Sequence, residues 1–222
     1  MHDRTRPLRF DDRYPGYDVL AKWNSPSWND KTREVIAKRL AIPNEPKFFT
    51  ADEFATVMSI AARIVPQPAS RADIPVAALV DHKLHHGVAD GYRLAGMPRQ
   101  GDAWRQGLKA LNEEAHRAFG KKFVGLSEAD QDQLLRRAER GELTAPEWGS
   151  MRSNDFFKRR LLHDIVLAYY GHPTAWSEIG WGGPAAPRGY VRLGFDDRDP
   201  WEAAEAKPGD EGEALRINRH VR

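Results

Sequence analysis

The sequence contains no cysteine among its 222 residues. This absence excludes disulfide bonds, thiolate nucleophiles, iron–sulfur clusters and covalently attached c-type haem. A chain without cysteine tolerates either redox state, so the absence gives no information about the compartment.

Long hydrophobic runs are also missing. No apolar run approaches the roughly 20 residues that cross a bilayer, so we expect no direct membrane insertion. The N-terminal stretch through Asp18 is charged and lacks the apolar core of a signal peptide. We therefore expect a cytoplasmic protein. Periplasmic placement would require that a leader has been removed or that the chain is exported with a partner.

An excess of charge of one sign is lacking as well. The 34 Lys and Arg residues nearly balance the 32 Asp and Glu residues, which leaves a net charge of +2. So small a net charge gives no field that would argue for nucleic acid or anionic lipid. The basic clusters at 136–140 and 158–160 are short. We expect no nucleic-acid partner.

Apolar residues at helical spacing fill the middle of the sequence. Start and stop signals accompany most of these stretches, such as the capping box of Thr50 and Glu53 and the closing glycines Gly120 and Gly141. We predict no strand. The predicted fold class is therefore all-α, a bundle of about six helices near 30–40, 50–65, 73–87, 102–119, 127–141 and 154–170.

Two segments flank the predicted helical domain of residues 29–171. An extended N-terminal arm covers 1–28, and an extended, partner-contacting segment with an acidic tail covers 172–222. Nine of the 24 residues from Gly171 to Gly194 are Gly or Pro, which predicts that this stretch is not helical. Both segments carry too many aromatic residues to be free disordered tails.

Aromatic side chains on an irregular backbone make good interface anchors, because each buries a large area and has few torsions to fix. Packing of the same side chains on the chain's own bundle is the alternative. We predict a partner interface that includes Trp23, Trp28, Tyr169, Tyr170, Trp176, Trp181, Arg188, Tyr190 and Trp201.

Few residues have a spacing typical of a metal-binding or catalytic site. His82 and His86 have the i, i+4 spacing that can place two imidazoles on one metal ion, but the Glu of an HExxH pattern is missing. A metal-dependent enzyme using these two, with His163 or His172, stays as an alternative. The adjacent His163 and Asp164 are more typical of a satisfied buried polar pair than of a catalytic one. We assign no catalytic, cofactor-binding or metal-binding residue.

Three stretches of the sequence resemble a known family. They read FFTADEFATVMSIAARIVPQ from Phe48 (with IPVAALVDHKL from Ile74), FVGLSEADQDQLLRRAERGE from Phe123, and FFKRRLLHDIVLAYYGHPTAWSEIGWGGPAAPRGYVRLG from Phe156. This pattern is similar to the gluconate 2-dehydrogenase subunit 3 family, the small subunits of bacterial FAD-dependent sugar and polyol dehydrogenases.

The resemblance implies a heterodimer with a large subunit, a flavoprotein of the glucose–methanol–choline type that binds FAD and oxidises an alcohol carbon. The small subunit would bind no cofactor, have no catalytic residues, and support folding, stability or export of the large one. Many members carry a twin-arginine leader, whereas Arg4 and Arg6 here precede no apolar stretch. A general helical adaptor, unrelated to redox enzymes, is the remaining alternative.

Overall fold

The computed structural model describes residues 12–69, 71–184, 192, 194–195 and 197–221. These residues form two compact units, which are described separately. Unit 1 comprises the described residues of Met1–Ala41, Pro68–Ala72 and Tyr170–Arg222, and unit 2 comprises Ile42–Gln67 and Asp73–Tyr169. The described residues are helical or irregular and contain no strand, which confirms the all-α prediction.

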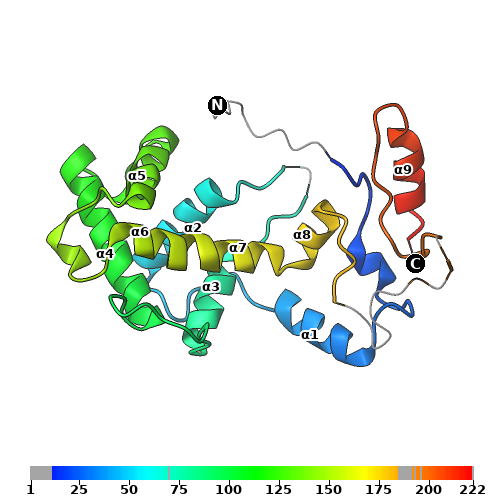
Figure 1. Cartoon of the computed structure of the whole chain (residues 1–222), viewed down its shortest axis with the longest axis horizontal. Coiled ribbons are helices and arrows are strands. Elements are labelled where there is room, and N and C mark those ends of the chain that lie inside the picture. The colour runs from blue at the N-terminus through cyan, green and yellow to red at the C-terminus, as the bar shows by residue number, and fades with distance from the viewer. Residues whose placement is uncertain (1–11, 70, 185–191, 193, 196, 222) are drawn as a thin grey trace. The chain divides into compact units, whose positions relative to one another are not determined.

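Unit 2 is built from the helices in the middle of the sequence (Figure 1). A π-helical segment, Phe157–Leu162, joins two of them into one continuous helical run, and short 3-10 turns lie at Phe123–Gly125 and Pro146–Trp148. The helices are α2 (Ala51–Ile64), α3 (Val76–His85), α4 (Gln100–Phe119), α5 (Glu128–Arg140), α6 (Ser153–Phe156) and α7 (His163–Tyr170), whose last residue belongs to unit 1.

Local sequence explains where these helices begin and end. Thr50 and Glu53 form the predicted capping box at the start of α2, and Ser127 caps α5 through the backbone N–H of Asp130. Gly120 and Gly141 end α4 and α5 with φ of 69° and 76°, a backbone conformation that favours glycine. These boundaries confirm the sequence prediction.

An aromatic cluster lies in the core of unit 2. Phe156 is fully buried and packs against Trp104 and Trp148, with ring centroids 5.8 and 5.7 Å away. Trp104 also contacts Phe49 at 5.7 Å. The buried carboxylate of Asp81 accepts three backbone N–H groups of residues 47–49, which fixes the chain before α2.

Unit 1 contains the 3-10 turn Val19–Lys22 and the helices α1 (Asp30–Leu40), α8 (Pro173–Glu178) and α9 (Glu211–Asn218). Its core brings the N-terminal arm and the C-terminal segment together, and consists of Tyr17, Val19, Trp28, Ile36, Trp176, Trp201 and Val221. The expectation that the stretch after Gly171 has no helix is wrong for α8. Pro173 occupies its first turn, where a missing N–H does no harm, and His172 caps it.

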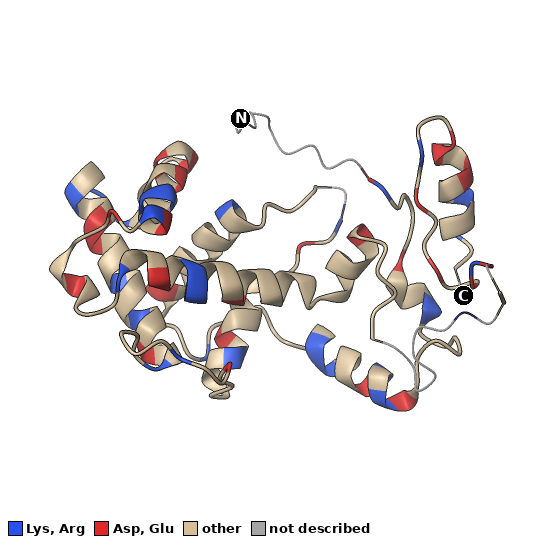
Figure 2. Cartoon of the chain, viewed as in Figure 1, with Lys and Arg blue, Asp and Glu red and all other residues tan. Residues whose placement is uncertain are grey.

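Charge is dispersed over both units. Figure 2 shows basic and acidic segments interspersed along α1, α5 and α9, which agrees with the small net charge. Among the described residues, no helix is long and apolar enough to span a membrane.

Candidate functional site

The carboxylate of Asp164, on α7, is completely buried and is surrounded by hydrogen-bond donors. Oδ2 accepts from Nε1 of Trp104 at 2.8 Å and from Nε2 of Gln100 at 3.2 Å, both on α4. Lys83 Nζ lies 3.2 Å from Oδ1, and the Arg160 guanidinium lies 3.3 Å from Oδ2. A buried carboxylate is tolerated only when it is paired in this way.

A second carboxylate, Asp90, comes from the segment between α3 and α4. It lies 2.6 Å from Lys83 Nζ and 3.2 Å from the Arg160 guanidinium, so the same two cations bridge both carboxylates. Partial burial raises the pKa of Asp90, but the hydrogen bonds and charges of Lys83 and Arg160 outweigh it and lower the pKa overall. The four groups form a closed ion-pair network that ties this segment to α3 and to the α6–α7 run.

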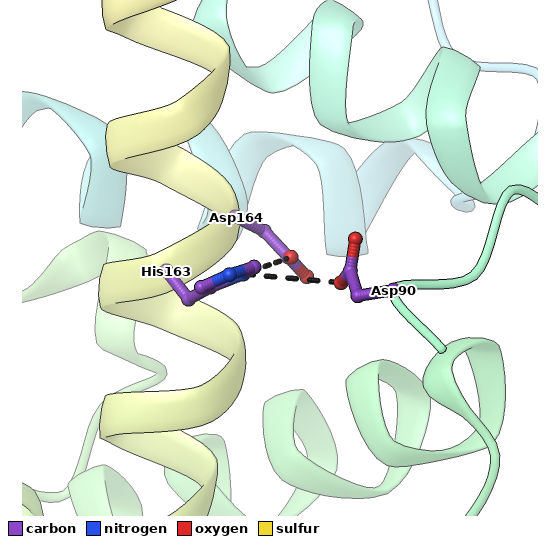
Figure 3. Close-up of side chains that lie close together, drawn as sticks. All are labelled: Asp90, His163 and Asp164. Atoms are coloured by element: carbon purple, nitrogen blue, oxygen red, sulfur yellow. Dashed lines mark hydrogen bonds and ion pairs between the residues drawn. The ribbon is translucent and has the colours of Figure 1, made fainter. Parts of the chain in front are cut away.

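His163 lies at the edge of the network (Figure 3). Its Nδ1 is 3.1 Å from Asp164 Oδ1 and 3.8 Å from Asp90 Oδ2, and 42% of its side chain is exposed. The figure shows His163 and Asp164 on one helix, facing Asp90 on a loop. The prediction of a satisfied buried pair is confirmed for Asp164, whereas His163 is half-exposed.

Asp90, His163 and Asp164 are the one group within the described ranges whose three potential ligand atoms lie within 4.8 Å of one another. A metal ion would have to displace Lys83 and Arg160, which already neutralise both carboxylates. The donor set therefore fits an ion-pair network and does not fit a metal site.

The other histidines of the metal hypothesis lie elsewhere. The rings of His82 and His86 are 4.3 Å apart, and burial, followed by the charge of His86, lowers the pKa of His82. No third ligand joins them among the residues that the structure describes. His172 belongs to unit 1, where its Nδ1 accepts the N–H of Thr174.

Next to the ion-pair network, unit 2 has a cavity of about 640 Å³. The segment between α3 and α4, the start of α4 and the helical run around Arg159 form its walls. Its lining combines apolar side chains such as Leu84, Val88 and Met97 with several arginines.

The predicted interface residues have very different exposures. Trp28, Tyr169, Trp176 and Trp201 are buried within the described chain, and Trp23 is partly buried against the unit 1 core. Tyr170 and Trp181 are 47% and 38% exposed. Arg188 and Tyr190 lie outside the described residues. Contact of these residues with a partner stays a prediction.

Sequence reasoning missed Lys83, Asp90 and Arg160 as parts of one network. Arg160 belongs to the short basic cluster 158–160 of the sequence, but only 12% of its side chain is exposed. The feature of the sequence that could have pointed to this network is the long non-helical stretch after α3, since loops of more than about 12–15 residues are usually functional or disordered.

Comparison with known proteins places the chain in a family. The family model described as gluconate 2-dehydrogenase subunit 3 matches residues 51–183, more than half of the chain. Comparison with curated proteins and with solved structures gives no match. The resemblance seen in the sequence is thus confirmed, and the chain belongs to the gluconate 2-dehydrogenase subunit 3 family.

Proposed function

We propose that this chain is the non-catalytic small subunit of an FAD-dependent sugar or alcohol dehydrogenase, and that it stabilises the large subunit or assists its maturation or export. The single observation that carries the proposal is the family match over 51–183, since the family is named as a subunit of a dehydrogenase. FAD would be held by the large subunit, a flavoprotein of the glucose–methanol–choline type.

The chemistry of unit 2 supports a non-catalytic role. Each carboxylate of the ion-pair network accepts from at least two cationic or neutral donors, so neither is poised to take a proton from a substrate. The partial burial of Asp90 is outweighed by Lys83, so its pKa lies below the ordinary value and its carboxylate is a poor base near neutral pH.

Exposed aromatic residues support a partner-binding role. Tyr170 and Trp181 belong to unit 1 and keep about half and a third of their surface accessible. Aromatic anchors of this kind dominate the energy of many interfaces. Their exposed faces are the parts of the predicted interface that a large subunit would cover.

Co-expression tests the proposal. A glucose–methanol–choline type flavoprotein from the same genome is produced with and without this chain, and its solubility, flavin absorbance and dye-reducing activity are measured. We expect a yellow complex that contains both chains, and a less soluble or less flavinated large subunit when this chain is omitted. A large subunit that is equally soluble, flavinated and active alone would contradict the proposal.

Copurification and metal analysis of the same preparations distinguish the alternative functions. A general adaptor would not copurify with the flavoprotein, whereas a metal-dependent enzyme would contain stoichiometric metal. Fractionation of cells that produce both chains tests our proposal of a cytoplasmic location against export with the partner.

A further inference from the structure

The cavity of unit 2 has an apolar interior and an apolar rim. Leu84 and Met97 are buried in its lining, at 7% and 5% exposure. At the rim, Val88 and Tyr92 are 56% and 82% exposed. An apolar surface that continues from a cavity onto exposed side chains is typical of a site that takes part of another protein. A small ligand that filled the cavity would leave the rim in water.

Positive charge surrounds this apolar surface. Arg93, Arg99 and Arg159 line the cavity, and none of them forms an ion pair with a described acidic residue. Among the residues that the structure describes, Arg93 donates only to the carbonyl of Met97. The one acidic lining residue, Asp90, is already neutralised by Lys83 and Arg160. The cavity therefore offers three arginines to a negatively charged occupant.

The cavity wall is held in place by the ion-pair network. The segment between α3 and α4 has no helix of its own, but Asp90 anchors it to Lys83 and Arg160. Anchoring limits the conformational entropy that the segment would lose on binding, which favours a docking site. This gives the buried Asp164 network a role: it positions a binding surface.

We propose that this cavity docks a segment of the large subunit that presents a carboxylate next to an apolar side chain. The inference rests on the proposed function and deepens it, since it names the surface and the chemistry of the contact. The carboxylate pairs with Arg99 and Arg159, and the apolar side chain enters beside Met97 and covers Tyr92.

Charge reversal tests the docking site. The double variant Arg99→Glu/Arg159→Glu is compared with Lys121→Glu/Arg136→Glu, which makes the same change of charge at exposed residues of unit 2 with no described ion-pair partner. The Kd for the purified large subunit and the Tm of each free variant are measured at low and high salt. We expect the cavity variant to raise Kd about tenfold or more and the control about twofold at most.

If charge reversal lowers the Tm of the free chain, the double variant Arg99→Gln/Arg159→Gln is used instead, because it removes the two positive charges without adding negative ones. It should also weaken binding and reduce the salt dependence of Kd. Binding that is unchanged in both cavity variants, while the wild type binds, would overturn the inference and leave the proposed function intact. A wild-type chain that does not bind the flavoprotein would overturn the proposed function itself.

A photo-crosslinking residue at Tyr92 identifies the occupant. In the complex, the crosslinker at position 92 should react with a large-subunit peptide that contains Asp or Glu beside an apolar residue. The control carries the crosslinker in place of Val124, which lies elsewhere on unit 2 and is 47% exposed. Crosslinks from Tyr92 to a second copy of this chain, or to a peptide without a carboxylate, would contradict the proposed occupant.

Discussion

At the scale of single residues, His172 shows how burial changes the chemistry of a helix cap. It is 8% exposed, and its Nδ1 accepts the N–H of Thr174 at 3.3 Å at the start of α8. Burial, and then the nearby charge of Arg39, lowers its pKa from 6.5 to about 4. The neutral imidazole is therefore the form that stabilises the fold.

As a consequence, the free energy of unfolding of the protein should decrease as the pH is lowered. Below the unfolded pKa of 6.5 the unfolded chain binds a proton at His172, whereas the folded chain resists until about pH 4. The free energy of unfolding contributed by this residue therefore decreases across that window, by about 2–3 kcal/mol at most. Urea unfolding at about pH 7.5 and about pH 4.5 measures the change.

The control is His172→Asn, because an asparagine side chain can cap a helix but does not titrate. The variant should lose less stability than the wild type between the two pH values. An equal loss in both proteins would show that His172 does not titrate as its burial suggests.

The ion-pair network around Asp164 could not be predicted from the sequence. His163 and Asp164 attract attention in the sequence because they are adjacent, but three of the side chains that bind Asp164, those of Lys83, Gln100 and Trp104, lie far along the chain. Gln100 is 64 positions away and Lys83 is 81. Helical periodicity predicts which face of a helix is apolar, but it contains no information on which distant charges meet.

At the scale of elements, close packing of α4 against the helical run that begins with α6 depends on one glycine. A Cβ added at Gly107 would lie 2.3 Å from ring atoms of the fully buried Phe156. We expect Gly107→Ala to reduce the free energy of unfolding by about 1–3 kcal/mol, because the aromatic cluster has to shift. Thermal or urea unfolding measures this.

A helical glycine with free space around it provides the matched control. Gly212 lies in α9, and a Cβ there would meet nothing within 4 Å. Because alanine has the higher helix propensity, Gly212→Ala should leave stability unchanged or raise it by up to about 1 kcal/mol. A Gly107→Ala variant as stable as Gly212→Ala would rule out a tight contact with Phe156.

Element boundaries could be predicted where one or two neighbouring residues determine them, as at Thr50, Gly120 and Gly141. The short helix α8 was missed because the glycine and proline content of its surroundings hides a local start signal, His172 followed by Pro173. The π-helical segment Phe157–Leu162 was missed too, since its residues fit an ordinary helical pattern and only tertiary packing reveals the wider turn.

At the scale of the whole chain, the aromatic residues allow two interpretations, contact with a partner or packing within the chain. Trp176 is 1% exposed, and its Nε1 donates to the carbonyl of Tyr170 at 2.6 Å. It also packs edge-on against Trp181, at 4.9 Å between ring centroids, and Trp181 is 38% exposed. Two neighbouring tryptophans can therefore have different roles, one in the core of unit 1 and one at its surface.

Alanine substitution should separate these roles. Trp176→Ala empties a large volume in the unit 1 core and should cost about 3–5 kcal/mol of stability. Trp181→Ala removes a partly exposed ring, so its own cost should be about 1 kcal/mol, while its effect on assembly should be the larger one. Thermal unfolding of the free chain and copurification with the flavoprotein measure the two effects. If Trp181→Ala lowered the Tm as much as Trp176→Ala and left copurification intact, both rings would serve internal packing, and the large subunit would have to bind elsewhere, for instance at the cavity of unit 2.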